Sequence, residues 1–148
     1  MAKKFSIYLI GSMRNPKVPQ IANRLRHRGF DVFDDWHATG PASDELRQKY
    51  EQKRGRSYID AMKGVHAVNV FNLDKHHLDT CDVAVMVLPA GRSAHLELGY
   101  KCGIGHKAYI LMPGEPNRFD VMYGFANAIF FNEQALTKEL IKERNRKS

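Results

Sequence analysis

Glu97 is the residue whose type and position point most directly to chemistry. It lies in the first or second turn of a helix predicted to follow a continuous apolar run, between Leu96 and Leu98. The positive end of a helix dipole favours a carboxylate there. A capping box does not fit, because it needs a glutamate three residues after the cap and Glu97 stands four after Ser93. One other interpretation stays open. A surface pair with Lys101, four residues on, fits the spacing equally well.

Small and cationic residues surround the predicted starts of two helices: Ser12, Arg14, Gly91, Arg92 and Ser93. Backbone N–H groups at helix N-termini bind phosphate. Neither GxGxxG nor GxxxxGK[ST] occurs, so we expect at most a phosphate site without a named motif. The alternatives are that the arginines are solvated surface cations and that Ser93 is an ordinary helix N-cap.

Three aspartates are candidates for proton transfer or ligand binding. Asp74 has the chemistry of a general acid, while Asp34 and Asp35 could accept hydrogen bonds from a base or sugar. Each is equally a helix cap or turn residue, Asp74 above all because a helix is predicted at 75–80. Trp36, the only tryptophan, either stacks on a base or covers its loop.

Cysteine and histidine spacing gives no metal site. His77 and Cys81 are four residues apart, but two ligands do not make a zinc site. Cys81 and Cys102 form no CxxC pair, so the sequence suggests neither a disulfide framework nor a zinc ribbon, and a reducing compartment fits. We therefore expect a cytoplasmic protein with no metal and no cofactor.

The elements that position these residues follow from hydrophobic periodicity. Strands are predicted at residues 5–10, 30–33, 65–71, 82–88 and 108–112. Helices are predicted at 18–27, 75–80, 92–102 and 133–142, with a helix or helix pair over 43–62 interrupted near Gly55. This alternation indicates a doubly wound α/β fold, flavodoxin- or Rossmann-like, in a single domain over residues 1–148. Its sheet should be five-stranded and mainly parallel, with helices on both faces.

In such a sheet, ligands bind beyond the carboxyl ends of the strands, at the switch point of strand order. Four segments therefore become candidates for the site: 11–15, 34–37, 72–74 and 89–97.

Charge and hydrophobicity narrow the classes of partner that the protein is expected to bind. The 148 residues include 23 Lys and Arg against 16 Asp and Glu, a net charge of +7 that favours phosphorylated or polyanionic partners. Interleaved glutamates in the basic stretch 138–147 favour a solvated last helix over nucleic-acid binding. No run approaches the roughly 20 apolar residues that span a bilayer, so we expect no membrane partner.

Three stretches of sequence carry a resemblance to a known family. They are IYLIGSMRN at 7–15, LDKHHLDTCDVAVMVLP at 73–89 and GRSAHLELGYKCGIGHKAYIL at 91–111. Together they resemble the nucleoside 2-deoxyribosyltransferase-like family, which includes 2′-deoxynucleoside 5′-phosphate N-hydrolases. The resemblance covers roughly residues 5–129.

The resemblance implies roles for particular residues. Glu97, in the ELG at 97–99, would be the nucleophile, Tyr8 would hydrogen-bond it, and Asp74 would be the acidic residue of the site. The turn Gly11-Ser12-Met13-Arg14 matches the GSxR of the phosphate-using branch, which favours a nucleotide over a nucleoside.

The chain departs from the family pattern at Gly91, six residues ahead of the glutamate, where the family usually has Ser or Asp. Arg92 and Ser93 are the candidates to compensate. The family also implies a homodimer or higher homo-oligomer in which a neighbour completes the site. Residues 119–127 (FDVMYGFAN) are expected to make that contribution, with Met122, Tyr123 and Asn127 as further substrate-binding candidates.

The function expected is cleavage or transfer at the N-glycosidic bond of a nucleotide or nucleoside, through a glutamate nucleophile. A carboxylate can capture the oxocarbenium-like centre covalently, while Asp74 or Asp35 protonates the departing base. Two alternatives remain: a non-catalytic module that binds or sequesters a nucleotide, and a glycohydrolase of a larger NAD- or ADP-ribose-type nucleotide.

Overall fold

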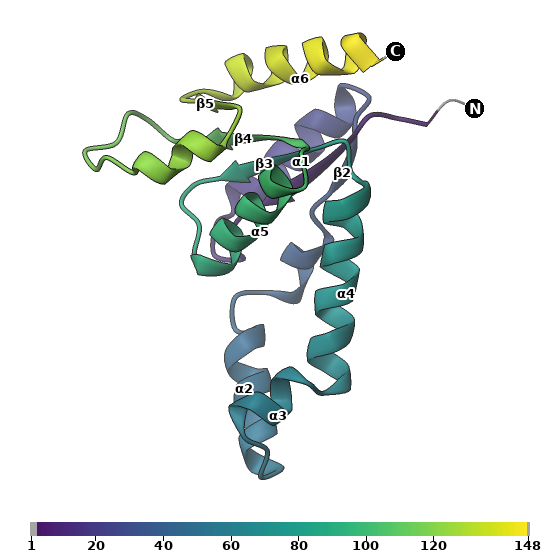
Figure 1. Ribbon diagram of the computed structural model, residues 1–148, viewed down its shortest axis with the longest axis vertical. Helices are drawn as coiled ribbons and strands as arrows, with labels where there is room; N and C mark the ends of the chain where they lie inside the picture. Colours follow the sequence, from purple (N-terminus) through teal and green to yellow (C-terminus); the bar gives the residue numbers. More distant parts are fainter. Residues whose placement is uncertain (1–2, 148) are drawn as a thin grey trace.

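The computed structural model describes residues 3–147; Met1, Ala2 and Ser148, which the predicted domain 1–148 includes, lie outside this range. Its centre is a five-stranded sheet in the order β2-β1-β3-β4-β5, with every neighbouring pair parallel (Figure 1). The strands are β1 (Ser6–Ile10), β2 (Asp31–Phe33), β3 (Val83–Val87), β4 (Lys107–Leu111) and β5 (Ala128–Phe130). The predicted doubly wound α/β fold is confirmed.

Six α-helices and two short 3-10 helices make up the other regular elements within residues 3–147. They are α1 (Lys17–His27), η1 (Asp35–Thr39), α2 (Ser43–Lys53), α3 (Tyr58–Met62), α4 (Val65–Thr80), α5 (Arg92–Gly103), η2 (Val121–Phe125) and α6 (Glu133–Lys147). The helix pair expected over 43–62 is confirmed as α2 and α3. Gly55 lies between them at φ +74°, a backbone conformation that glycine adopts without strain. No helix within residues 3–147 is both long enough and apolar enough to cross a bilayer.

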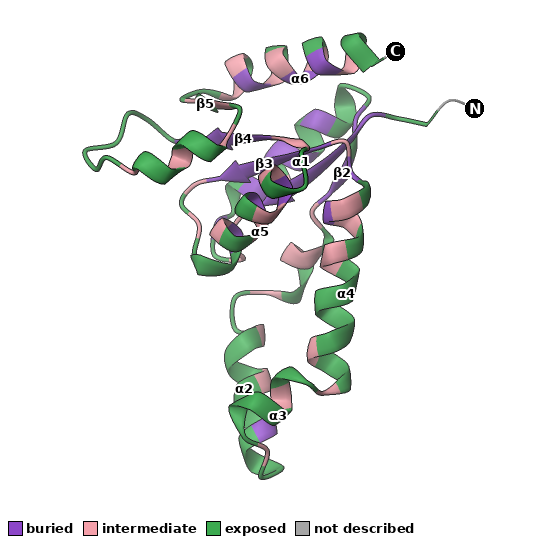
Figure 2. Cartoon of the chain, viewed as in Figure 1, coloured by how far each residue is buried: buried purple, intermediate pink, exposed green. Residues whose placement is uncertain are grey.

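The sheet is buried on both faces: every residue of β1 and β3 is buried, and all of them except Ser6 are apolar. Alternate residues face opposite sides of the sheet. Ile7 and Leu9 pack in the cluster shared with α1 and α6, whereas Tyr8 and Ile10 pack in the cluster shared with α5 and the end of α4. Figure 2 shows the buried residues concentrated in these strands. This alternation decides which side chains of β1 face the helix that carries Glu97.

The strand predicted at 65–71 is wrong: these residues form the first half of α4. The segment projects away from the sheet, where no strand is available to accept its backbone hydrogen bonds, and a helix satisfies those bonds internally. The remaining strand of the sheet is β5, which pairs with β4 and lies in the stretch 119–131, where the mixed character of the sequence predicted no strand. Asp74 therefore comes from a helix and not from the end of a strand.

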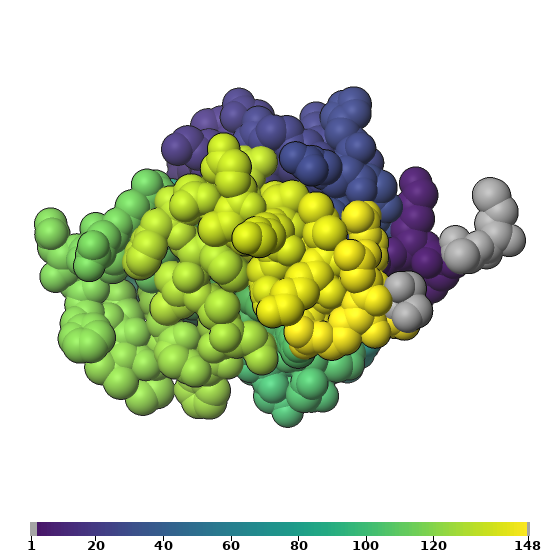
Figure 3. Space-filling model, turned by 90° about the horizontal axis from the view of Figure 1, so that it is seen from above, coloured from purple at the N-terminus to yellow at the C-terminus, as the bar shows by residue number. Residues whose placement is uncertain are grey.

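We call residues 43–73, which comprise α2, α3 and the first half of α4, the arm. In Figure 1 the arm extends from the body of the molecule, and in Figure 2 most of it is exposed. At the opposite end, α6 and the residues that precede it cover the sheet when the molecule is viewed from above (Figure 3).

Candidate active site

The strand order reverses between β1 and β3, so the crevice of this fold lies beyond the carboxyl ends of these two strands. β1 ends beside Gly11, and β3 leads to Gly91 and the start of α5. A Cβ on Gly11 would lie 3.0 Å from Val18 Cγ2 and 3.5 Å from the Trp36 ring. Glycine at this position therefore lets α1 and Trp36 close tightly over the end of β1.

Tyr8 and Glu97 form the central pair of the site. Tyr8 is fully buried in β1, where its ring packs 5.1 Å from that of Phe33, and its hydroxyl points toward α5. There it donates a 2.5 Å hydrogen bond to Glu97 Oε2. Ala94 and Leu98 are buried on the same helix, so α5 is seated firmly on the sheet and holds Glu97 at the sheet surface.

The environment of this pair raises the pKa of both groups and so favours their protonated forms. Burial raises the pKa of Glu97 to about 7, against the opposing effect of the Tyr8 hydrogen bond, and the charge of Asp74 adds to the rise. The pKa of Tyr8 is raised well above its usual range by burial and by Glu97, so Tyr8 stays a neutral donor. A carboxyl group that titrates near neutral pH at a crevice is typical of functional sites.

Asp74 belongs to the same group although it comes from α4. Its charge acts on both Glu97 and Tyr8. Burial raises the pKa of Asp74, and the nearby His77 partly offsets this rise. The structure thus brings together Tyr8, Glu97 and Asp74, and the pKa of both carboxyl groups is raised by burial.

Two alternative interpretations of the start of α5 are wrong. Lys101 does not pair with Glu97: it is fully buried and donates to the carbonyl oxygens of Leu78 and Cys81 at the end of α4. Ser93 is not the N-cap, because α5 begins at Arg92 after Gly91. Arg92 and Ser93 are exposed in the first turn. A Cβ on Gly91 would meet no atom within 4 Å, so packing does not require glycine there.

The turn after β1 presents the groups expected for a phosphate. Ser12 Oγ accepts from the backbone N–H of Arg14 at 3.1 Å. The Arg14 side chain is 68% exposed and lies 3.5 Å from Glu45. Asn15 is buried, and its Oδ1 accepts from the N–H of Lys17 at the start of α1. Asn15 Nδ2 is buried with no hydrogen-bond partner among the described residues.

Of the candidate residues after β2, Asp34 and Trp36 make contacts within the fold, whereas Asp35 lines a cavity. Asp34 forms an ion pair with Arg26. Trp36 donates from Nε1 to the Leu9 carbonyl oxygen at 2.8 Å and packs against both core clusters. Asp35 is exposed and lines a cavity of about 320 Å³ with, among others, His77 of α4.

The three candidate substrate-binding residues between β4 and β5 lie in different surroundings. Tyr123 lies beside His95 of α5: His95 Nδ1 donates to the Gly91 carbonyl oxygen at 2.6 Å, and His95 Nε2 is hydrogen-bonded to the Tyr123 hydroxyl at 2.8 Å. Met122 is 70% exposed. Asn127 precedes β5 at the other edge of the sheet, where its Oδ1 accepts from the Ala108 N–H. The structure does not bring Asn127 to the other site residues.

Sequence reasoning missed two histidines of the site. His77 lies three residues after Asp74 on α4 and stacks on Phe33 with ring centroids 3.7 Å apart. Its i+3 spacing from Asp74 was the available signal, once 65–80 is recognised as one helix. His95 lies two residues before Glu97 and connects the start of α5 to η2. Within residues 3–147, no group of three or more His, Cys, Asp or Glu side chains could hold a metal ion.

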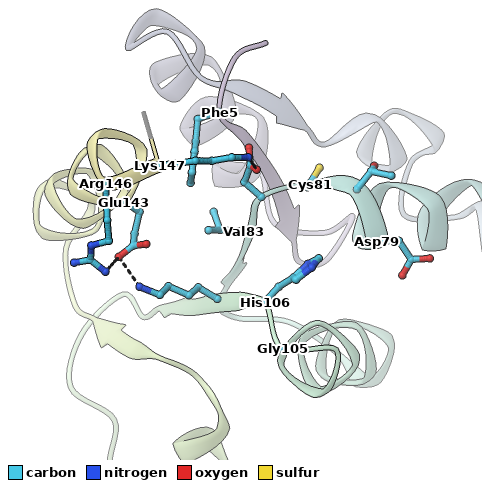
Figure 4. A pocket seen from close by; sticks show the side chains of 12 residues that line it. Phe5, Asp79, Cys81, Val83, Gly105, His106, Glu143, Arg146 and Lys147 are labelled. Carbon is cyan, nitrogen blue, oxygen red and sulfur yellow. Dashed lines mark hydrogen bonds and ion pairs between the residues drawn. The ribbon is translucent and has the colours of Figure 1, made fainter. Parts of the chain in front are cut away.

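The larger cavity, about 590 Å³, lies at the amino ends of β3 and β4, away from the switch point (Figure 4). Its charged side chains are largely paired with one another. Glu143 accepts from Lys107 and Arg146 at 2.7 Å each, and Lys147 pairs with Asp82. The size of a cavity alone therefore does not identify the candidate site in this molecule.

Comparisons with known proteins bear on the fold. Two solved structures are similar to nearly the whole chain. A 2-deoxyribosyltransferase from Bacillus psychrosaccharolyticus has a TM-score of 0.59 and 17% identity, over 89% of this chain and 90% of that one. The CMP N-glycosidase of Clostridium botulinum has a TM-score of 0.50 and 14% identity, over 91% and 97%. The chain shares their fold. No protein-family model and no curated protein sequence matches it.

Proposed function

We propose that this protein cleaves or exchanges the N-glycosidic bond of a nucleotide or nucleoside, with Glu97 as the nucleophile. The observation that carries the proposal is the Tyr8–Glu97 hydrogen bond at the switch point, with Asp74 within electrostatic range of both residues. The printed activities of the two structural neighbours, 2-deoxyribosyl transfer and CMP N-glycosidic cleavage, support the same reaction class.

In the first half of the reaction, ionised Glu97 attacks the anomeric carbon of the sugar. Tyr8 engages Oε2, so Oε1 is the oxygen left to form the new bond. The bond between the anomeric carbon and the base nitrogen breaks, and its electron pair stays with the base. Asp74 gives its proton to the base, which leaves neutral.

In the second half, the glycosyl ester on Glu97 is resolved. The carboxylate of Asp74 takes a proton from water, and the resulting hydroxide oxygen bonds to the anomeric carbon as the ester bond to Glu97 breaks. A second base can replace water, in which case a new nucleoside forms. Two inversions at the anomeric carbon give net retention.

A nucleoside monophosphate is the substrate form that the turn after β1 favours. Ser12, Arg14 and the N-terminus of α1 lie beside the crevice, and the buried Nδ2 of Asn15 has a donor to offer. A 5′-phosphate would satisfy donors of this kind.

The test is to incubate the purified protein with a panel of nucleosides and their monophosphates and to follow free base by chromatography. Release of base by wild type, with none by Glu97→Gln, is the expected result. Glu115→Gln, an exposed glutamate in the turn after β4, is the matched control and should retain full turnover. Absence of base release from every member of the panel would contradict the proposal.

A further inference from the structure

The second half of α4 carries a histidine, His77, whose ring is held by three contacts. Its Nδ1 donates to the Leu73 carbonyl oxygen, one turn earlier on the same helix, at 2.9 Å. One face of the ring stacks on Phe33 of β2, with centroids 3.7 Å apart and planes inclined by 11°. The His76 ring meets it edge-on at 5.3 Å. These contacts hold the half-buried ring in one orientation.

A continuous series of contacts leads from His77 to Glu97. The Phe33 ring packs against the Tyr8 ring, with centroids 5.1 Å apart, and the Tyr8 hydroxyl donates to Glu97 Oε2 at 2.5 Å. Phe33 and Tyr8 are buried in the same core cluster, and close packing leaves neither ring room to shift by itself. The position of the Tyr8 hydroxyl therefore depends on what supports Phe33, and His77 supplies part of that support.

The same histidine acts on Asp74, the second carboxyl group of the site. Burial raises the pKa of Asp74, and His77 is the group that opposes the rise. Because His77 follows Asp74 by three residues, their side chains are neighbours on the surface of α4. Lys75 and Asp79 lie on the other side of the helix, at 100° per residue, and are paired there. They leave the interaction between His77 and Asp74 undisturbed.

His77 also borders the cavity of about 320 Å³ beside β2, so water reaches the ring. Within residues 3–147, no ion pair or hydrogen bond joins it to another ionisable side chain. The ionisable groups around it come from its own helix and from the elements packed against α4: Tyr8, Asp31, Asp35, Asp74, His76, Cys81 and Glu97.

We propose that His77 is a positioning residue for both carboxyl groups of the site. Through Phe33 and Tyr8 it fixes the orientation of Glu97, and through its charge it acts on Asp74 from the next turn of α4. His77 itself is placed at no reacting atom. The role rests on the proposed reaction, in which Glu97 attacks and Asp74 donates a proton. Rates of such reactions depend steeply on the relative placement of the two groups.

Two substitutions separate the contact from the charge. His77→Phe keeps an aromatic ring against Phe33 without a charge, whereas His77→Ala removes both. Carbon-13 NMR titration of the Asp74 and Glu97 carboxyl groups in the unliganded protein follows each group directly. The midpoint of Asp74 should move to higher pH in both variants, because the group that lowers its pKa is lost. The midpoint of Glu97 should move to higher pH in His77→Ala but not in His77→Phe, because only the former disturbs the Tyr8 hydrogen bond that lowers the pKa of Glu97.

Steady-state kinetics give the second measurement. His77→Ala should lower kcat about tenfold to a hundredfold with KM nearly unchanged, because a misplaced nucleophile slows the chemical step without weakening substrate binding. His77→Phe should restore most of kcat. His66→Ala is the matched control, since His66 is an exposed histidine in the first half of the same helix. It should change neither titration midpoint nor kcat.

An unchanged Glu97 midpoint in a folded His77→Ala protein, as judged by circular dichroism, would overturn the link through Phe33 and Tyr8. An unchanged Asp74 midpoint in His77→Phe would overturn the effect of the charge. If His77→Ala does not fold, His77→Leu replaces it in the same titrations, because leucine fills much of the space without an aromatic stack. The titrations need no turnover. A protein that releases no base would therefore refute the proposed reaction, while the midpoints still decide whether His77 positions the carboxyl groups.

Discussion

Tyr8 and Glu97 are 89 residues apart in the chain and meet in a 2.5 Å hydrogen bond between the middle of the sheet and the second turn of α5. The bond occupies one oxygen of the carboxylate and lowers the pKa that burial has raised. The reactive carboxylate is therefore oriented by a residue of the core. Six predictions test this arrangement and its surroundings.

Glu97→Ala should reduce base release at least about a thousandfold while the protein remains folded, because the nucleophile is lost with little packing. Single-turnover assays with chromatography of the free base, together with circular dichroism, measure both effects. Turnover at the wild-type rate in a folded variant would remove Glu97 from the mechanism.

The pH dependence of kcat/KM should show a rising limb near pH 7, because Glu97 must be ionised to attack. Tyr8→Phe removes a hydrogen bond that lowers the pKa of Glu97, so the limb should move to higher pH. Tyr109→Phe is the matched control: its buried hydroxyl has no hydrogen-bond partner among the described residues and lies in the opposite core cluster. If the rising limb of kcat/KM stays at the same pH in Tyr8→Phe, the Tyr8 hydrogen bond does not lower the pKa of Glu97.

The same pKa governs stability. Because the folded-state pKa of Glu97 lies above its ordinary value of 4.5, the folded protein binds more protons between pH 4.5 and about 7. Stability should therefore fall as pH rises through this window, by up to roughly 3 kcal/mol. Glu97→Gln removes the effect, so it should be more stable than wild type at pH 8 and equal to it below pH 4.5. Urea denaturation at both pH values measures the difference, and equal stability at pH 8 would contradict it.

Asp74→Asn should slow base release about 10²- to 10⁴-fold for ordinary substrates, since the departing base then lacks its proton donor. A substrate whose base is already cationic needs no proton and should lose much less. Asp35→Asn, on the exposed side of the neighbouring cavity, is the control for the other acid candidate. Equal losses with both kinds of substrate would exclude proton donation by Asp74.

Arg14→Ala should erase most of the preference for a nucleoside monophosphate over its nucleoside. A charge-assisted contact contributes about 1.5–3 kcal/mol, or one to two decades in affinity, and salt should weaken it. Loss of the exposed Arg14–Glu45 ion pair should by itself lower the stability of the protein very little. Arg118→Ala, an 85% exposed arginine paired with Asp120, should change neither affinity. Identical monophosphate binding by wild type and Arg14→Ala would place the phosphate elsewhere.

Lys101→Met should lower the free energy of unfolding by about 2–4 kcal/mol, because two buried carbonyl groups, of Leu78 and Cys81, lose their donor. Lys138→Met on the exposed side of α6 should have no measurable effect. Thermal and urea denaturation compare the variants. A Lys101→Met protein as stable as wild type would show that these carbonyl groups find other partners.

Continuous apolar runs made β1 and β3 predictable. The positions expected for the crevice and for Glu97 followed from these two strands. The valine-rich residues 65–71 have the local character of a strand, but they lie outside the sheet, and only the three-dimensional arrangement excludes strand pairing there. The role of Lys101 was hidden for a related reason. Spacing placed it on the same helix as Glu97, but which direction its side chain takes depends on α4, a segment more than twenty residues away.

Trp36 gives the molecule a built-in optical reporter. It is the only tryptophan, and its indole closes the end of β1 beside Gly11 while bonding to the Leu9 carbonyl oxygen. Every photon of tryptophan emission therefore originates at the rim of the crevice, and a change in the polarity of that rim registers directly in the fluorescence of the unlabelled protein.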